Sequence, residues 1–549
     1  MCDYCSYLAK ERDREVLSLA SAGVSFLFVE YPEFHAVVSG LNKKARAPIR
    51  RALVEKMREI KKNLESEVAL MLDDEYVAIT TDGWTSRSNE SYMSLTVAYI
   101  DVGWQLHHLS LNCTKHTGST HGEDLAREIT SMIERHGLTG RVTACVTDCE
   151  PSMVKAGRLL EVGGSNLEHI GCSNHRMEST TSSVFNGKSL GALAKARAVV
   201  GRYKRSSQMS GRLAVFIGIL KLSPLSVLQD VETRWWSSWA MIERLLYLMK
   251  AIKLHESTDN IAPVLSETDW EVLRLIEPIL RPFMQAQKDL EGAKYVTGSM
   301  TVPKIGELRN GLEAAIADLR ATDRFGISAS TREAMEAVLP DAEALWEDFL
   351  NRWGDGSSIL EYREGKRRQP QGFKLQQVCA TAVDPRAKHL YGIRQAEHAS
   401  VWRAVATKAV DIAAEKFSSD NTATSGSAPA AQPVGTPPVA PGGQGAPKRA
   451  RLSAFEAAAA AHAGAAASSA GGQTLDEKRE QLASVVDLEV ASFQTTPGIS
   501  IWYWGTDGKK VYNDPLDWWR TRQMEFPHLA ALARRVLAIP SSQAHSERV

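Results

Sequence analysis

The sequence predicts a mixed α/β protein in which one small sheet is combined with a much larger set of helices. Strand-forming patterns are concentrated between residues 76 and 172, and a helical pattern extends from about residue 179 to 415. A helical segment also separates two of the buried strands. A helix that connects strands of one sheet places them parallel, whereas tight turns give antiparallel neighbours. We therefore expect a mixed five-stranded sheet with helical additions.

Length and composition bound the possible functions. The chain has 549 residues, which is too many for one hydrophobic core, so we expect two or more domains. Lys and Arg number 65 and Asp and Glu also number 65, so any nucleic-acid contact must use a local basic patch. Seven scattered cysteines indicate a reducing compartment. We find neither a signal peptide nor a run of about 20 apolar residues, and we expect an intracellular, soluble protein without membrane contact.

The run from 76 to 86 alternates β-branched and small residues and then reaches Asp82 and Gly83. This pattern is typical of a strand buried on both faces, with a carboxylate at its C-terminal end. A rigid strand end suits a metal ligand. The alternative is an Asp-Gly turn that closes a hairpin.

The following segments predict the rest of the sheet. Runs at 91–101 and 105–111, joined by a short turn, favour an antiparallel meander with the first strand. A helix from Gly122 to about Gly137 leads to a buried strand that ends in Asp148. A helix at 152–160 and a strand at 169–172 complete the order of a ribonuclease-H-like core. Adjacent carboxylates repel each other unless a cation lies between them, so the pair Asp82 and Asp148 implies a metal or a raised pKa.

The remaining chain is mostly helical, with one exception. In the helical part, Pro278 is expected to end a helix that contains residues 271–276. Residues from about 418 to 473 are rich in Ala, Gly, Ser and Pro and are expected to be disordered. They contain the basic run 447–451, which is typical of a nuclear-import signal. Asp514 and Pro515 have the chemistry of a helix start. The expected divisions are a helical region 1–70, a core 71–178, an α-helical segment 179–415, a disordered segment 416–475 and a C-terminal region 476–549.

Several motifs occur in one order along the chain. They are Thr81-Asp82-Gly83-Trp84-Thr85-Ser86, His121-Gly122-Glu123, Val146-Thr147-Asp148, His169-Ile170-Gly171-Cys172-Ser173-Asn174-His175, Thr233-Arg234-Trp235, Asp514-Pro515-Leu516-Asp517-Trp518-Trp519 and Ile539-Pro540 through Val549. Together they resemble the hAT superfamily of cut-and-paste DNA transposases and its BED-zinc-finger-type relatives. The resemblance covers nearly the whole chain outside the low-complexity segment.

The resemblance implies a ribonuclease-H-like core interrupted by a large all-α insertion and completed by a helical C-terminal dimerisation region. It also implies a DDE triad of catalytic and metal-binding carboxylates at Asp82, Asp148 and Glu547, with Mg²⁺ or Mn²⁺ as cofactor. Two such ions stabilise both the attacking and the leaving oxygen during phosphodiester cleavage and strand transfer. The implied setting is the nucleus, with DNA and a second copy of the chain as partners.

Further roles follow from the same resemblance. Cys172 and His175 look like a Cys-x-x-His motif beside the active site, and Arg234-Trp235 looks like a pair that holds the DNA end. The alternatives are a zinc site that Cys2 and Cys5 would complete, and helix packing for Trp235, Trp236 and Trp239. We expect phosphate contacts from Lys43, Lys44, Arg46, Arg50 and Arg51. We expect dimerisation through Trp518, Trp519, Leu529, Leu532, Val536 and Leu537.

The sequence also departs from the family pattern. No BED finger precedes the core, Glu150 and Pro151 replace small polar residues after Asp148, and two residues follow Glu547. A helix this short is marginal without packing, so we expect Glu547 to be poorly placed and cleavage to be compromised. Three hypotheses result: a transposase-derived protein with a weakened DDE site, a domesticated non-catalytic DNA-binding and dimerising regulator, or a metal nuclease that shares only the core.

Overall fold

The computed structural model describes the chain in several stretches. They are residues 26–44, 46–86, 88–163, 166–182, 189–231, 235–292, 294–321, 326–356, 359–364, 370–423, 475–506, 508 and 510–544. The chain forms two compact units, one of Met1–Tyr76 with Ser131–Arg141 and one of Val77–Thr130 with Val142–Val549. The first 25 residues and most of the low-complexity segment lie outside the described stretches. Residues 416–423 do not, because the helix that begins at His398 continues to Ala423.

The first unit is helical where it is described, in agreement with the expectation for this region. It contains the 3₁₀ turn η1 (Phe26–Glu30) and helices α2 (Pro32–Leu41) and α3 (Arg50–Met71). Its small core consists of Val29, Leu53 and Ile60. The guanidinium of Arg141 donates to the Gly137 carbonyl at 2.7 Å and to the Leu72 carbonyl, so it closes the end of α3.

The second unit contains the predicted mixed sheet. Its strands are β1 (Val77–Thr85), β2 (Ser91–Ile100), β3 (Leu106–Lys115), β4 (Val142–Thr147) and β5 (Glu168–Gly171), in the order β3-β2-β1-β4-β5. The first three pair antiparallel, and β4 is parallel to both β1 and β5. Within β1, Gly83 pairs with Met93 and the strand continues to Thr85. The Asp-Gly turn considered for this position is therefore wrong.

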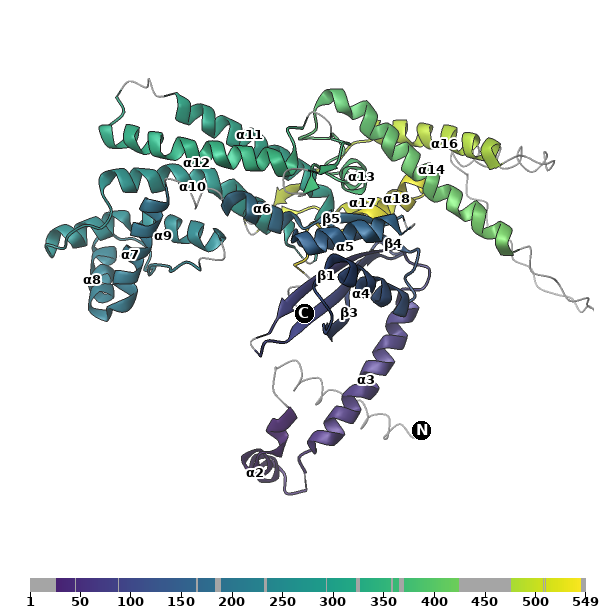
Figure 1. The fold of residues 1–549 in the computed structure, drawn as a ribbon, viewed down its shortest axis with the longest axis horizontal. Coiled ribbons are helices and arrows are strands. Elements are labelled where there is room, and N and C mark those ends of the chain that lie inside the picture. Colours follow the sequence, from purple (N-terminus) through teal and green to yellow (C-terminus); the bar gives the residue numbers. More distant parts are fainter. Residues whose placement is uncertain are drawn as a thin grey trace, which may run out of the picture. The chain divides into compact units, whose positions relative to one another are not determined.

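Helices cover the sheet and extend well beyond it (Figure 1). In chain order they are α4 (Gly122–Arg135), α5 (Pro151–Val162), α6 (Ser173–Ser182), α7 (Leu190–Arg205), α8 (Ser207–Ile219), α9 (Trp235–Thr258), α10 (Glu267–Leu290), η3 (Gly298–Met300), α11 (Thr301–Arg320), α12 (Ala329–Trp353), α13 (Leu375–Val383), η5 (Gln395–Glu397), α14 (His398–Ala423), α16 (Leu475–Thr495), α17 (Pro515–Arg522) and α18 (Pro527–Leu537). Two short hairpins are also present, β6 (Arg363–Glu364) with β7 (Pro370–Gln371) and β8 (Trp502–Trp504) with β9 (Lys510–Tyr512).

One helix boundary differs from the prediction. Pro278 does not end its helix, since α10 runs for 24 residues with both Pro278 and Pro282 inside it. A proline removes one backbone donor and clashes with the preceding turn, which normally breaks a helix. Here α10 packs along α12 and α11 (Figure 1), and it buries Leu273, Leu280 and Phe283 almost completely. This burial of apolar surface offsets the local cost of the prolines.

The C-terminal region packs into the core of the second unit. Asp514 caps α17 as expected, because its carboxylate accepts from the Leu516 amide at 2.9 Å. The apolar residues expected at a dimer interface are instead buried within this chain. Their exposed fractions are 9% or less for Trp518, Trp519, Leu529, Leu532, Val536 and Leu537. This apolar stripe therefore packs within the chain, because helices α13, α14 and α16 pack against α18 and cover it.

Candidate functional site

Two carboxylates lie just beyond the paired part of the neighbouring parallel strands β1 and β4. Asp82 lies on β1, and Asp148 comes directly after β4. The register of the two strands pairs Thr80 with Val146, so each aspartate is two residues beyond the same pair. Neighbouring strands lie about 4.8 Å apart, and residues two apart on a strand share a face. The sheet therefore presents the carbonyl ends of β1 and β4, with one acid each, at the same edge.

A hydrogen-bond relay fixes the end of β4. The hydroxyl of Thr147 donates to the Asp148 carbonyl at 2.8 Å, and its oxygen is 2.8 Å from Nε2 of His169 on β5. Burial lowers the pKa of His169 to about 3, so the ring is neutral at physiological pH. Because the Thr147 proton is already used, Nε2 carries the hydrogen and donates to Thr147. This relay holds the backbone that carries Asp148.

The same imidazole requires a glycine on the neighbouring helix. A β-carbon on Gly157 of α5 would lie 2.1 Å from Cγ of His169, closer than any real contact. The close approach of α5 to β5 therefore depends on Gly157. At the start of α5, the Glu150 amide donates to Oδ1 of Asp148 at 3.0 Å, which directs this carboxylate toward the N-terminus of the helix.

The end of the described chain reaches the first carboxylate. Residues after α18 form an irregular segment of turns and bends, here called the C-terminal strap (residues 538–544). Nε2 of Gln543 donates to Oδ1 of Asp82 at 3.1 Å, across 461 positions of sequence. The backbone N–H of Gln543 also donates to Sγ of Cys172 at 3.5 Å, and the backbone N–H of Ser173 donates to the Ser541 carbonyl at 2.9 Å. The strap thus joins β1 to the start of α6.

The strap is held from its other side by the helical part of the unit. A β-carbon on Gly298 of η3 would lie 2.1 Å from the Ile539 carbonyl oxygen, so the strap approaches η3 as closely as a glycine permits. The hydroxyls of Ser541 and Ser542 both donate to the Leu290 carbonyl at the end of α10. Both hydroxyls therefore anchor the strap to the end of α10.

The Cys-x-x-His residues lie at the start of α6. Cys172 is fully buried, and its amide donates to the Thr147 carbonyl at 2.7 Å. His175 is partly buried one turn along α6. The next residue, Arg176, is buried with its guanidinium carbon 3.7 Å from the Trp353 ring centroid, and it donates to the Gly372 carbonyl at 3.1 Å. Burial lowers its pKa to about 10. Arg176 therefore anchors α6 to the end of α12 as a buried cation.

A cavity of about 210 Å³ opens beside Asp148. Trp84 and Tyr92 stack on each other in its wall, with ring centroids 5.8 Å apart. His116 also lines it. Nδ1 of His116 is 2.5 Å from Oε2 of Glu128, and its buried Nε2 has no hydrogen-bond partner among the described residues. A second cavity of about 590 Å³ shares part of this wall and is lined by the basic residues Lys155 and Arg158.

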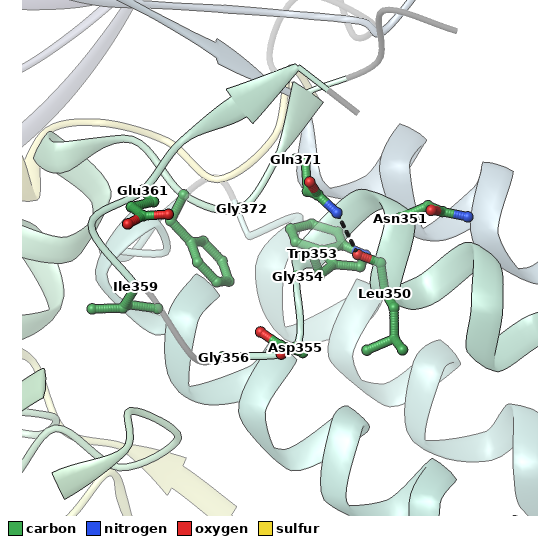
Figure 2. Close-up of a pocket in the computed structure, with 11 residues that line it drawn as sticks. Leu350, Asn351, Trp353, Gly354, Asp355, Gly356, Ile359, Glu361, Gln371 and Gly372 are labelled. Atoms are coloured by element: carbon green, nitrogen blue, oxygen red, sulfur yellow. Dashed lines mark hydrogen bonds between the residues drawn. The ribbon is translucent and has the colours of Figure 1, made fainter. Parts of the chain in front are cut away.

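Another cavity, of about 240 Å³, lies at the end of α12 (Figure 2). The side-chain amide of Gln371 donates to the Leu350 carbonyl at 3.0 Å across its rim, and Trp353 stands in its wall (Figure 2). Among the described residues, its lining includes the acids Asp355 and Glu361 and no lysine, arginine or histidine.

The remaining expected site residues fall into three groups. Glu547 and Arg234 lie outside the described stretches, and Trp235 begins α9 but its side chain is not described. Trp239 is buried and donates from Nε1 to Glu277 at 3.1 Å, as expected for helix packing, whereas Trp236 is 42% exposed. The five basic residues expected to contact phosphates are exposed, and Arg51 pairs with Glu55.

The donor set fits a hard divalent cation. Asp82 and Asp148 supply carboxylate oxygens at one sheet edge. Oε1 of Gln543, whose amide is already at Asp82, is buried and has no hydrogen-bond partner among the described residues. Oxygen ligands of this kind are those that Mg²⁺ and Mn²⁺ prefer. Three His, Cys, Asp or Glu side chains close enough to hold a metal are not found within the described part of the chain, to which Glu547 does not belong.

Comparison with known proteins identifies the architecture. Residues 80–163 match the ZBED1 RNase-like domain, residues 170–279 match the ZBED1 RNase-like helical domain, and residues 507–549 match the hAT family C-terminal dimerisation region. The chain therefore combines two ZBED1-type RNase-like regions with an hAT-type C-terminal dimerisation region. The first match contains Asp82 and Asp148, and the last contains Gln543 and Glu547. The hydrogen bond between Gln543 and Asp82 connects two matched regions that are far apart in the sequence.

Three relatives resemble this chain at low identity. "Zinc finger BED domain-containing protein 4" of Homo sapiens is 22% identical over 57% of this chain and 27% of its own length. "Putative AC transposase" of Zea mays is 24% identical over 54% of this chain and 39% of its own. "Putative transcriptional regulator tpeD" of Talaromyces stipitatus is 23% identical over 53% and 39%. The aligned regions span between about a quarter and two fifths of these relatives.

Sequence reasoning missed two residues of the site. Gln543 was part of a quoted motif without a role, and His169 was placed only on a strand. Neither has a local signal, because each acts through a partner that is distant in sequence.

Among the described helices, none combines the length and the apolar character that are needed to cross a bilayer.

Proposed function

We propose that this chain is a nuclear, transposase-derived protein that binds DNA, forms a homo-oligomer and carries a DDE-type site for metal-dependent phosphodiester cleavage. The observation that carries the proposal is the hydrogen bond between Gln543 and Asp82. It brings the C-terminal family region, which includes Glu547 four residues later, to the strand that carries the first acid. Asp148 follows the adjacent parallel strand. These two observations support the assignment of the family triad to Asp82, Asp148 and Glu547 in this proposal.

The residues around this edge have separable roles. Asp82 and Asp148, with Glu547, would hold Mg²⁺ or Mn²⁺, and such an ion stabilises charge on the attacking and leaving oxygens. His169 and Thr147 keep the backbone at Asp148 in place. Lys155 and Arg158 line the cavity that adjoins the Asp148 cavity and supply positive charge for a phosphate backbone. Cys172, through its contact with the Gln543 amide, positions the strap.

DNA affinity would come from several basic groups. Lys43, Lys44, Arg46, Arg50 and Arg51 are exposed and can contact phosphates without altering the acidic site. Arg234 and Trp235, which match the family pair at the DNA end, are assigned the same role by resemblance. Basic residues 447–451 serve as the nuclear-import signal in this proposal.

The structure suggests a different surface for dimerisation than the sequence did. Trp502, Tyr503 and Trp504 of β8 are 37%, 51% and 66% exposed, three to five residues before the matched dimerisation region begins at residue 507. Three consecutive exposed aromatic residues are unusual on a monomer surface, and aromatic residues are enriched in interfaces. In the proposal this hairpin contacts the second copy.

The decisive experiment separates binding from cleavage. We expect the chain to bind duplex DNA, and to nick supercoiled plasmid weakly and only with Mg²⁺ or Mn²⁺, because the cleavage site is expected to be compromised. Asp82→Asn and Asp148→Asn should abolish nicking and keep binding. Asp101→Asn is the matched control, since Asp101 directly follows another strand of the same sheet and pairs with His107.

The second candidate is a DNA-binding and dimerising regulator without cleavage activity. It is favoured by the relative whose name describes a transcriptional regulator. Binding without cation-dependent nicking at any Mg²⁺ or Mn²⁺ concentration would select this candidate. A ribonuclease-H-like nuclease, the third hypothesis, would cleave an RNA strand in an RNA–DNA hybrid in preference to duplex DNA.

A further inference from the structure

The amide of Gln543 occupies a place where a cation is expected. Its Nε2 is 3.1 Å from Oδ1 of Asp82, and the residue is only 1% exposed. The other amide atom, Oε1, is buried without a hydrogen-bond partner among the described residues. A buried amide oxygen without a partner is unfavourable, and such groups in native proteins generally have a function or a missing ligand.

The two amide atoms have opposite chemistry. The amide nitrogen donates a hydrogen bond and suits an unshielded carboxylate, whereas the amide oxygen accepts and can bind a hard cation. Rotation about the last side-chain bond exchanges the two atoms without moving the rest of Gln543. One side chain can therefore satisfy Asp82 in the absence of a cation and become a neutral oxygen ligand in its presence.

The backbone around Gln543 makes this exchange possible. The backbone N–H of Gln543 donates to Sγ of Cys172, and the backbone carbonyl of Ser541 accepts from the Ser173 N–H. The hydroxyls of Ser541 and Ser542 both donate to the Leu290 carbonyl. The strap is thus held by several contacts that do not involve the glutamine side chain. A ligand on a rigid backbone keeps its position when the side-chain group turns.

We propose that Gln543 is an additional oxygen ligand for the divalent cation at Asp82, and that its amide covers the Asp82 carboxylate as a hydrogen-bond donor when no cation is bound. This inference rests on the proposed function, because it assumes that Asp82 holds a cation. It assigns Gln543 a role of its own, separate from the three acids of the triad. It also predicts that residue 543 sets cation affinity.

Cation binding to the full chain tests the inference without any cleavage assay. Melting temperature and titration calorimetry would be followed with MnCl₂ and with MgCl₂, after removal of metals with EDTA. We expect Gln543→Ala to weaken the apparent affinity about tenfold, the lower end of the range for residues that support metal ligands. Gln543→Glu should melt lower than the wild type without cation, because two carboxylates then face each other, and should bind the cation more tightly.

Two controls make the outcome specific. Gln287→Ala removes another glutamine whose Oε1 is buried without a partner among the described residues, in α10, and should leave cation affinity unchanged. Asp82→Asn should abolish the cation-induced shift. Circular dichroism would verify that each variant is folded, and Gln543→Glu decides the matter if Gln543→Ala is unstable.

The possible failures are distinguishable. If Asp82→Asn abolishes cation binding but Gln543→Ala and Gln543→Glu both retain the wild-type affinity, the role of Gln543 is refuted and the proposed metal site stands. If the wild type and Gln543→Glu show no shift with either cation, or Asp82→Asn binds as well as the wild type, both the inference and the metal site of the proposed function are refuted.

Discussion

The indole of Trp519 in α17 stacks on the indole of Trp104, with ring centroids 5.6 Å apart and planes within 7°. Trp104 lies in the turn between β2 and β3, so the contact joins the C-terminal region to the first half of the sheet. Nε1 of Trp104 donates to Gln523 at 3.0 Å, and Nε1 of Trp519 donates to the Val383 carbonyl at 3.0 Å. The C-terminal region is thereby an internal part of the second unit.

Truncation of Trp519 should strongly destabilise the chain. The side chain is fully buried, so Trp519→Ala removes its packing and leaves a cavity, at a cost of about 3–5 kcal/mol. Urea denaturation followed by circular dichroism would measure the loss. Trp236→Ala is the matched control, because Trp236 is 42% exposed and its change should cost less than about 1 kcal/mol. Equal losses for both variants would contradict the packing described here.

The buried imidazole of His169 should make stability depend on pH. Burial lowers its pKa to about 3, whereas the unfolded chain has a value near 6.5, so the unfolded state binds more protons between these limits. This contribution to stability is therefore present above about pH 6.5 and is lost progressively as the pH falls toward 3. From pH 7 to pH 5 the expected loss from this group is about 2 kcal/mol.

His169→Gln isolates the contribution of His169 to the pH dependence of the free energy of unfolding. The variant can still offer a donor to Thr147 but does not titrate, so its stability should fall less between pH 7 and pH 5 than that of the wild type. The measurement is urea denaturation at both pH values, in buffer with EDTA. Parallel losses in the two proteins would show that His169 is not the group responsible.

The sequence predicted the sheet well and the site only in part. Strand order and direction followed from the alternating pattern and from the helix that precedes the strand before Asp148. The course of α10 through Pro278 did not follow, because tertiary packing outweighed a local rule. The contact of Gln543 with Asp82 spans 461 positions, and a local pattern cannot reveal it.

The stripe of α17 and α18 shows the same limitation. Trp518, Leu529 and Val536 have the spacing of an apolar helix face, and the sequence alone does not distinguish a face that packs within the chain from one that binds a partner. The structure resolves this by burying all three. The low-complexity segment, Glu547 and Arg234 remain predictions, since they lie outside the described stretches.

DNA binding should depend on salt through the exposed basic residues of the first unit. Each phosphate contact contributes a slope of about −0.9 to the dependence of log affinity on log salt. We expect Lys43→Gln with Lys44→Gln to weaken binding and to reduce the slope by about 2. The matched control is Lys61→Gln with Lys62→Gln. It removes the same charge from α3, which begins after Lys43 and Lys44, and should change the slope by much less. Fluorescence anisotropy between about 50 and 200 mM salt gives the slopes. Equal slopes for the two double variants would place the DNA contact elsewhere.

Dimerisation should depend on the exposed hairpin and not on the buried stripe. Trp504 is 66% exposed and Tyr503 is 51% exposed, so their replacement by serine removes apolar surface without opening a cavity. Central aromatic residues of an interface typically contribute 2 kcal/mol or more, which corresponds to a loss of affinity of about 30-fold.

We therefore expect the wild type to scatter light as a dimer at micromolar concentration and the Tyr503→Ser, Trp504→Ser variant as a folded monomer. Trp236→Ser, the control at an exposed tryptophan outside the C-terminal region, should remain dimeric. If the variant with both hairpin substitutions is folded and still dimeric, the dimer does not depend on these two aromatic side chains, and another surface forms the contact.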